Sequence, residues 1–166
     1  IRTEVIKYLD KPVVDGNGDK VTERTVIRED GTKVVTRFND KGDRLQTLYK
    51  NDKGQVTVAE GQGVTTWFTY DDKGQVKAIV STDPRLNREM QSDGTWKGPG
   101  GVEKWDSVKV DDKTGWTTFK SADLERTVFT SGFIKDTNLM VLQSLICLVA
   151  LVPNTILTLI VQSKWT

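Results

Sequence analysis

The chain has no histidine and a single cysteine, so two common sources of enzyme and metal chemistry are missing. Histidine is the most frequent general base and metal ligand in proteins, and without it a catalytic role rests on carboxylates. The lone Cys147 excludes a disulfide framework and a thiolate metal cluster. The serines before residue 139 lack the G-x-S-x-G setting of a nucleophile elbow. The sequence therefore predicts a protein that is not an enzyme and has no cofactor.

Blocks of like charge are also absent. The 24 basic and 23 acidic residues are interspersed, and the net charge is only +1. A nucleic-acid footprint or a polybasic lipid-binding patch would need basic residues gathered in one stretch or on one face. We therefore expect no nucleic-acid partner.

One long segment at the C-terminal end carries no charge at all. Residues 139–161 read LMVLQSLICLVALVPNTILTLIV, and every charged residue except Lys164 lies in positions 1–136. A helix of this length measures about 34 Å, enough to cross a hydrocarbon core of about 30 Å. Lys164 and Trp165 follow the segment, as expected at the headgroup level. The segment is predicted to be a transmembrane helix bent near Pro153.

The alternatives for this segment are a buried core helix, which Pro153 would end in a soluble protein, and the removed tail of a lipid-anchor precursor. Polar side chains within it suit contact with a neighbouring helix, although Ser and Thr can also bond their own backbone. The predicted helix contacts are Gln143, Ser144, Asn154 and Thr158.

The rest of the chain alternates between short strand-like runs and turns rich in Asn, Asp and Gly. We predict a mainly β fold, an antiparallel meander closed as a barrel or folded as a sandwich, with residues 1–132 as the soluble domain and 133–166 as the transmembrane helix with its tail. Residues 83–90 suit a short helical turn, and residues 97–101 suit a loop. The predicted strands are residues 3–9, 21–28, 33–38, 44–49, 55–59, 64–70, 75–80, 102–110, 116–120 and 126–129.

An internal repeat accompanies these turns. The run KNDKGQV at residues 50–56 recurs as YDDKGQV at residues 70–76, with a weaker copy at 38–42 and one with an insertion at 111–116. The pattern Tyr70-Asp71-x-x-Gly74-x-Val76 resembles the YD repeats of bacterial Rhs-type shells over roughly residues 30–80. That resemblance implies a fragment of an Rhs-like secreted effector with a membrane-active tail.

Two acidic patterns imitate functional sites. Asp15, Asn17 and Asp19 match the first ligands of a calcium loop, but Lys20 and Val26 replace its glycine and its bidentate glutamate. The paired acids at residues 71–72 and 111–112 fall in predicted turns beside lysine, where solvated turn residues are expected. We therefore predict no metal site and no catalytic carboxylate pair.

Aromatic residues near the predicted helix are the better candidates for function. They suit either a protein core or an exposed patch against a partner subunit, a pigment or the headgroup layer. The candidate patch consists of Trp96, Trp105, Trp116, Phe133 and Trp165.

The pattern favours a non-catalytic, single-span accessory subunit of an organelle membrane complex, photosynthetic (thylakoid) or respiratory (inner mitochondrial). Its partners would be other membrane subunits and lipid. The alternatives are a membrane-tethered β-barrel holding a small apolar ligand or pigment, and the Rhs-like fragment.

Overall fold

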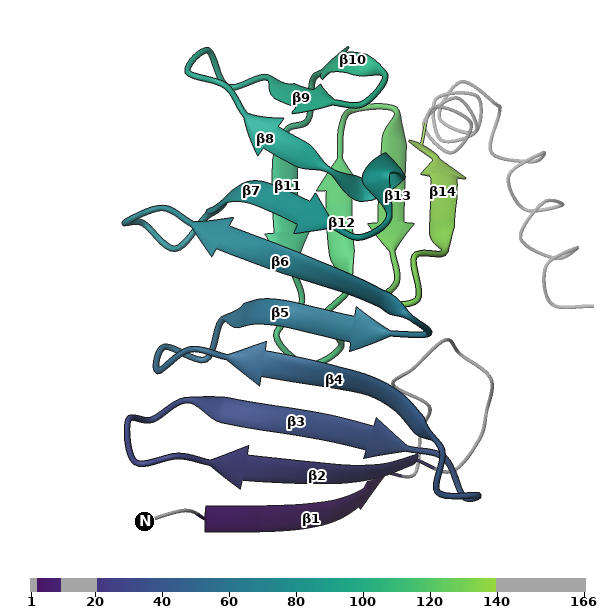
Figure 1. The fold of residues 1–166 in the computed structure, drawn as a ribbon. Coiled ribbons are helices and arrows are strands. Elements are labelled where there is room, and N and C mark those ends of the chain that lie inside the picture. Colours follow the sequence, from purple (N-terminus) through teal and green to yellow (C-terminus); the bar gives the residue numbers. More distant parts are fainter. Residues whose placement is uncertain (1–2, 10–20, 140–166) are drawn as a thin grey trace, which may run out of the picture.

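A computed structural model describes residues 3–9 and 21–139, and the regular secondary structure of this part of the chain is β-strand apart from one short 3₁₀ helix. Its strands form two antiparallel sheets, each a meander in which every strand pairs with its neighbour in sequence. In Figure 1 the strands of the second sheet lie behind the upper part of the first sheet and run across its strands. The predicted antiparallel meander is therefore confirmed, in the form of two sheets.

The first sheet has ten strands in the order β1 to β10. A short 3₁₀ helix, Pro84–Leu86, precedes β8, where the sequence predicts a helical turn. The strands are β1 (Thr3–Leu9), β2 (Val21–Ile27), β3 (Lys33–Phe38), β4 (Arg44–Lys50), β5 (Val56–Gly61), β6 (Val64–Tyr70), β7 (Val76–Ser81), β8 (Arg88–Met90), β9 (Trp96–Gly98) and β10 (Gly101–Glu103).

The second sheet has four strands in the order β11 to β14, and β11 and β14 are its edges. They are β11 (Ser107–Val110), β12 (Thr117–Lys120), β13 (Leu124–Val128) and β14 (Ile134–Asn138).

The copies of the repeated motif form hairpin turns. The copies at residues 50–56 and 70–76 join β4 to β5 and β6 to β7 at the same end of the first sheet, the copy at 38–42 joins β3 to β4 at the opposite end, and the copy at 111–116 joins β11 to β12 (Figure 1). In the copy at residues 51–55, the amide of Gly54 donates to the Asn51 carbonyl at 3.0 Å, and Gly54 has φ +81°. The Asn51 side-chain oxygen also accepts from the amides of Lys53 and Gln55. A side chain lacking glycine's freedom would be strained at that φ, which explains why glycine recurs at the same place in each copy.

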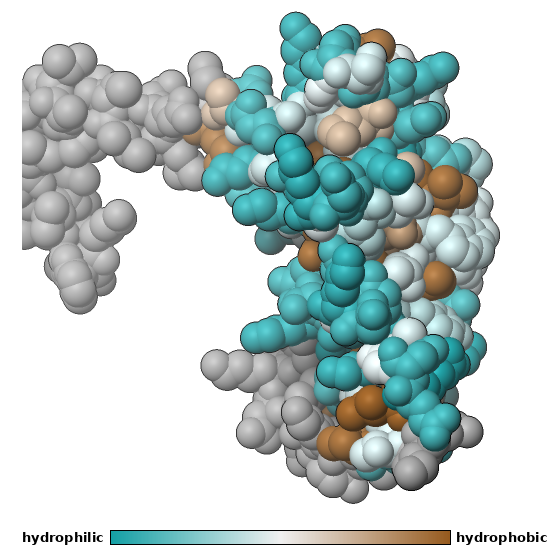
Figure 2. Space-filling model, turned by 90° about the vertical axis from the view of Figure 1, so that its left-hand side faces the viewer, coloured by the Kyte–Doolittle hydropathy of each residue, from teal (hydrophilic) through white to brown (hydrophobic). Residues whose placement is uncertain are grey.

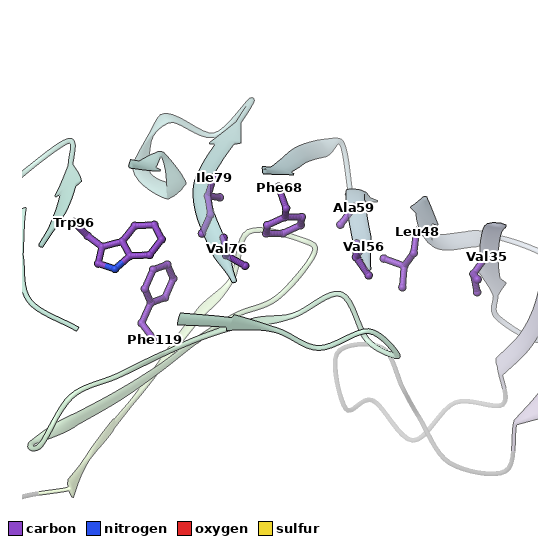
Figure 3. Close-up of a cluster of buried hydrophobic side chains, with 9 residues drawn as sticks. All are labelled: Val35, Leu48, Val56, Ala59, Phe68, Val76, Ile79, Trp96 and Phe119. Carbon is purple, nitrogen blue, oxygen red and sulfur yellow. The ribbon is translucent and has the colours of Figure 1, made fainter. Parts of the chain in front are cut away.

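The hydrophobic core lies between the sheets. Leu48 and Val56 are almost completely buried on the side of the first sheet that faces the second. Phe119 of β12 points toward Trp96 of β9 and joins the sheets at the other end of the core (Figure 3). Burying a large apolar side chain is worth roughly 1.5–3 kcal/mol, so this row of side chains accounts for the pairing of the two sheets.

A buried polar network fastens the same junction further along. The Arg37 guanidinium donates to the Glu23 carboxylate at 3.1 Å and to the Gln46 side-chain carbonyl at 2.8 Å. The Gln46 amide in turn donates to the Thr114 carbonyl at 3.0 Å and to the Thr130 hydroxyl at 3.2 Å. Arg37 and Gln46 are 3% and 1% exposed, so these polar groups depend on one another for partners.

The structure differs from the sequence predictions at several places. Neither sheet closes into a barrel within the described residues, because the strand orders end at β1, β10, β11 and β14. The predicted loop at residues 97–101 is instead the β9–β10 hairpin, and the predicted strand at 102–110 is divided between β10 and β11. The second sheet continues through β14, past the predicted domain boundary at residue 132.

The predicted transmembrane helix lies outside the described residues except for Leu139. No helix within residues 3–9 and 21–139 has both the length and the apolar character needed to cross a membrane.

Candidate functional site

A groove of 520 Å³ lies between strand β11 and hairpin turns of the first sheet. The turns at residues 51–55, 71–75 and 91–95 form one wall, and β11 forms the other. Its described lining includes residues of β11 but none of β12, so the groove runs along the free edge of β11. Figure 2 views the molecule from the side of these turns, where hydrophobic side chains in brown show between hydrophilic ones in teal.

The groove has an apolar floor. Met90, at the end of β8, is partly exposed there, whereas Val56 and Val76, at the starts of β5 and β7, are 1% and 4% exposed and lie beneath the surface of the floor. Tyr70 and Trp105 add aromatic surface, and both are half-buried against the core. An extended apolar wall of this kind can take up side chains of a bound molecule.

The polar tips of these aromatic residues already have partners. The Tyr70 hydroxyl donates to the Val56 carbonyl at 2.6 Å, and burial raises the pKa of Tyr70 to about 12, so the phenol stays protonated. The Trp105 ring N–H donates to the Glu103 carboxylate at 3.0 Å. Trp105 also packs against Phe119 with ring centroids 5.3 Å apart, and the Arg126 guanidinium lies 5.7 Å from its ring. The aromatic wall is therefore fixed before any ligand arrives.

Charges of both signs surround the groove. Lys53 and Lys109 lie on its rim with Asp106 and Asp112, and all four residues are exposed. Burial lowers the pKa of the neighbouring Lys50, while Asp112 acts in the opposite direction. The rim therefore has no strong preference for one sign of charge, and specificity has to come from individual positions.

The wall formed by β11 offers free backbone groups. In an antiparallel pair, the residues whose N–H and C=O bond the neighbouring strand alternate with residues whose groups point away. The Asp111 amide donates to the Trp116 carbonyl at 2.8 Å, and counting back by two places Lys109 and Ser107 in the bonded set. The N–H and C=O groups of Val108 and Val110 therefore point away from β12, toward the groove.

In the described part of the chain, β12 is the only strand that pairs with β11. No turn or side-chain hydrogen bond among those residues reaches the backbone of Val108 or Val110. The groove thus combines apolar side chains with a short row of unpaired backbone donors and acceptors.

The space between the two sheets is much smaller. Phe68, Leu86 and Phe119 line it together with Thr130, and it holds only about 20 Å³. A space of this size has room for about one water molecule. It does not offer the interior that a bound apolar ligand or pigment would require.

The predicted aromatic patch divides between two places. Trp96 and Trp105 lie together beside the groove, although Trp96 is only 3% exposed and belongs to the core. Trp116 and Phe133 meet at another place through Phe129, whose ring centroid is 4.4 Å from that of Trp116 and 5.7 Å from that of Phe133. The predicted site residues outside the described part of the chain are Trp165, Gln143, Ser144, Asn154 and Thr158.

Sequence reasoning missed the other groove residues. Tyr70 and Met90 carry no local signal of a site, and the role of β11 depends on which strands neighbour it in space. The only available hint was the coincidence of Tyr70 with the repeated turn motif, which places an aromatic residue at the end of a strand next to a turn.

Candidate catalytic and metal sites find no support among the described residues. No group of three or more acidic or cysteine side chains there could hold a metal ion. Asp71 and Asp111 use their carboxylates to accept backbone N–H groups within their own turns. The predicted calcium-loop residues at 15–19 lie outside the described part of the chain.

The described carboxylates whose pKa values are lowered owe the change to local hydrogen bonds and ion pairs. The Arg126 guanidinium holds the pKa of Asp136 below its usual value, and hydrogen bonds from Thr32 and Thr95 lower the pKa values of Asp30 and Asp93. These groups are dispersed over the surface and do not converge on a cleft.

Comparison of the chain with protein-family models, with curated proteins and with solved structures found no match.

Proposed function

We propose that the chain is a non-catalytic interaction module that holds a segment of a partner protein in the groove beside β11. The observation that supports this most directly is the pairing of an apolar floor with the outward-facing backbone groups of Val108 and Val110. Unpaired backbone groups are satisfied best by another backbone, and an apolar floor is covered best by side chains. A polypeptide supplies both at once.

Other ligand classes suit the groove less well. A sugar would need open aromatic faces for stacking, but Trp96 is buried and Trp105 packs on Phe119. A small apolar molecule would leave the N–H and C=O groups of Val108 and Val110 without partners, and would find the rim crowded with charged groups. Both considerations favour a peptide segment.

The setting of this interaction is part of the same proposal. The uncharged run at residues 139–161 supports membrane anchorage, and the module would then act as an accessory subunit beside other membrane proteins. Extraction of the natural membrane fraction with alkaline carbonate tests the anchorage. A chain retained in the pellet supports it, and a chain released by carbonate alone contradicts it.

Selection from a display library of random twelve-residue peptides tests the groove itself. The target is the full chain in mild detergent, and enriched peptides are measured against two matched variants. Met90→Lys places a charge in the apolar floor, whereas Val80→Lys places the same charge on the outer face of the sheet, where Val80 is 55% exposed. We expect the first variant to lose at least tenfold in affinity and the second to bind like the wild type.

A second groove variant is needed because Met90→Lys could lose affinity through a folding defect alone. Gln75 lines the groove with an exposed side chain, so Gln75→Trp obstructs the groove without disturbing the core. Peptides that bind both groove variants as tightly as the wild type would contradict the proposal, and so would a selection that enriches nothing.

A further inference from the structure

Strand β11 lines the groove, whereas the edge strands β10 and β14 contribute no residue to its lining. The edge strand β14 carries charged side chains and its Asp136 pairs with Arg126 at 2.8 Å, while β10 has only three residues. An exposed edge invites pairing with another chain, and proteins commonly protect it with charge or short length. At β11 the apolar floor of the groove provides a place for the side chains of an added strand.

The side chains of β11 define the two faces that an added strand would have. Val108 and Val110 pack against the core, so they face the first sheet. Lys109 lies between them, points to the opposite face and is exposed. Residues that stand directly opposite each other in an antiparallel pair share a face. A strand beside β11 would therefore place two residues toward the floor and the residue between them beside Lys109.

We propose that the partner segment adds to β11 as an antiparallel strand with the pattern apolar–acidic–apolar. This inference rests on the proposed function and specifies the partner. The two apolar residues stand opposite Val108 and Val110, exchange backbone hydrogen bonds with them and reach the floor near Tyr70 and Met90. The acidic residue stands opposite Lys109 and pairs with its ammonium group.

Lys109 has an alternative explanation, since a lysine in the middle of an edge strand also discourages unwanted pairing. In that case the charge would oppose any added strand rather than select an acidic residue. The two explanations predict different responses to reversal of the charge.

The first test uses short synthetic peptides and the full chain in mild detergent, with amide chemical shifts as the readout. The probe is the blocked peptide Thr-Ile-Glu-Ile-Thr, at up to about 5 mM, because a short strand is expected to bind with a Kd near the millimolar range. Methylating the backbone nitrogen of either Ile removes a donor that faces β11, and we expect a loss of about tenfold or more. Methylating the nitrogen of Glu affects a group that faces away, and binding should persist.

The opposite pattern of sensitivity to methylation would contradict the antiparallel arrangement. Equal sensitivity at all positions would contradict strand addition, and so would the absence of any shift at Val108 and Val110. If these peptides fail but the display library still yields peptides that need Met90, the groove is a binding site and only the strand model is wrong.

The second test reverses the charge. We expect Lys109→Glu to bind Thr-Ile-Lys-Ile-Thr more tightly than Thr-Ile-Glu-Ile-Thr, by about two- to fivefold, and the wild type to show the reverse preference. Lys77→Glu is the matched control, because Lys77 is exposed but does not line the groove. A preference that is unchanged in Lys109→Glu would contradict the assignment of the acidic position.

Discussion

Replacing Arg37 by methionine should destabilise the protein severely, because the side chain is buried and two polar groups depend on it. The Arg37 guanidinium lies 2.9 Å from the Glu23 carboxylate, and the side chains are 4% and 16% exposed. It also supplies the donor for the Gln46 carbonyl, which has no other donor among the described residues. Methionine fills a similar volume but donates no hydrogen bond.

The expected loss of stability follows from the two polar groups that lose their donor, the Glu23 carboxylate and the Gln46 side-chain carbonyl. Leaving one partner of a buried ion pair uncompensated costs about 3–5 kcal/mol, and the partial exposure of Glu23 places the cost toward the lower end. The Gln46 carbonyl adds roughly 1 kcal/mol or more as an unsatisfied buried acceptor. We therefore expect Arg37→Met to lower the free energy of unfolding by about 4 kcal/mol.

Urea unfolding of the full chain in mild detergent, followed by tryptophan fluorescence, measures this loss. The double variant Arg37→Met with Glu23→Leu removes the stranded carboxylate as well, and should recover most of the stability because apolar replacement of a whole buried pair is often neutral. A loss below about 1 kcal/mol in the single variant, or no recovery in the double variant, would refute the reasoning.

Two further changes have defined outcomes in the same unfolding assay. A Cβ at Gly61 would lie 3.0 Å from the Thr130 carbonyl oxygen, so Gly61→Ala should cost about 1–3 kcal/mol, whereas Gly100→Ala meets no neighbour and should be neutral; equal effects would contradict the close contact. Burial raises the pKa of Tyr70 to about 12, so its neutral phenol contributes stability that is present below the unfolded value near 10 and is lost as the pH rises toward 12. The upper limit of this contribution to the free energy of unfolding is about 2.7 kcal/mol, and we expect about 1–2 kcal/mol because Tyr70 is only half-buried. Tyr70→Phe should lack this part of the pH dependence, and an unchanged profile would contradict it.

The local features of the fold could be predicted because they are encoded by neighbouring residues. The turn at residues 51–55 needs a side-chain acceptor at Asn51 and a positive φ at Gly54, and both are visible in the sequence. Strands β3 and β6 occupy the predicted residues for the same reason, since they lie between such turns.

The remaining features depend on contacts between distant residues. The sequence of β14, IKDTN, has no apolar alternation and forms a strand because β13 provides a register for it. The β9–β10 hairpin contains a glycine-rich stretch that resembles an open loop. The groove could not be predicted either, because it requires β11 to lie across the turns of another sheet, and no local pattern specifies that arrangement.

Amide hydrogen exchange along β11 tests the proposed strand-addition site most directly. In the free chain the amides of Val108 and Val110 should exchange rapidly, because they point into the groove, while the amide of Lys109 should be protected by its bond to β12. Adding the peptide Thr-Ile-Glu-Ile-Thr should slow exchange at Val108 and Val110 and leave Lys109 unchanged. Protection of Val108 and Val110 in the free chain, or exchange there that the peptide does not slow, would contradict the account.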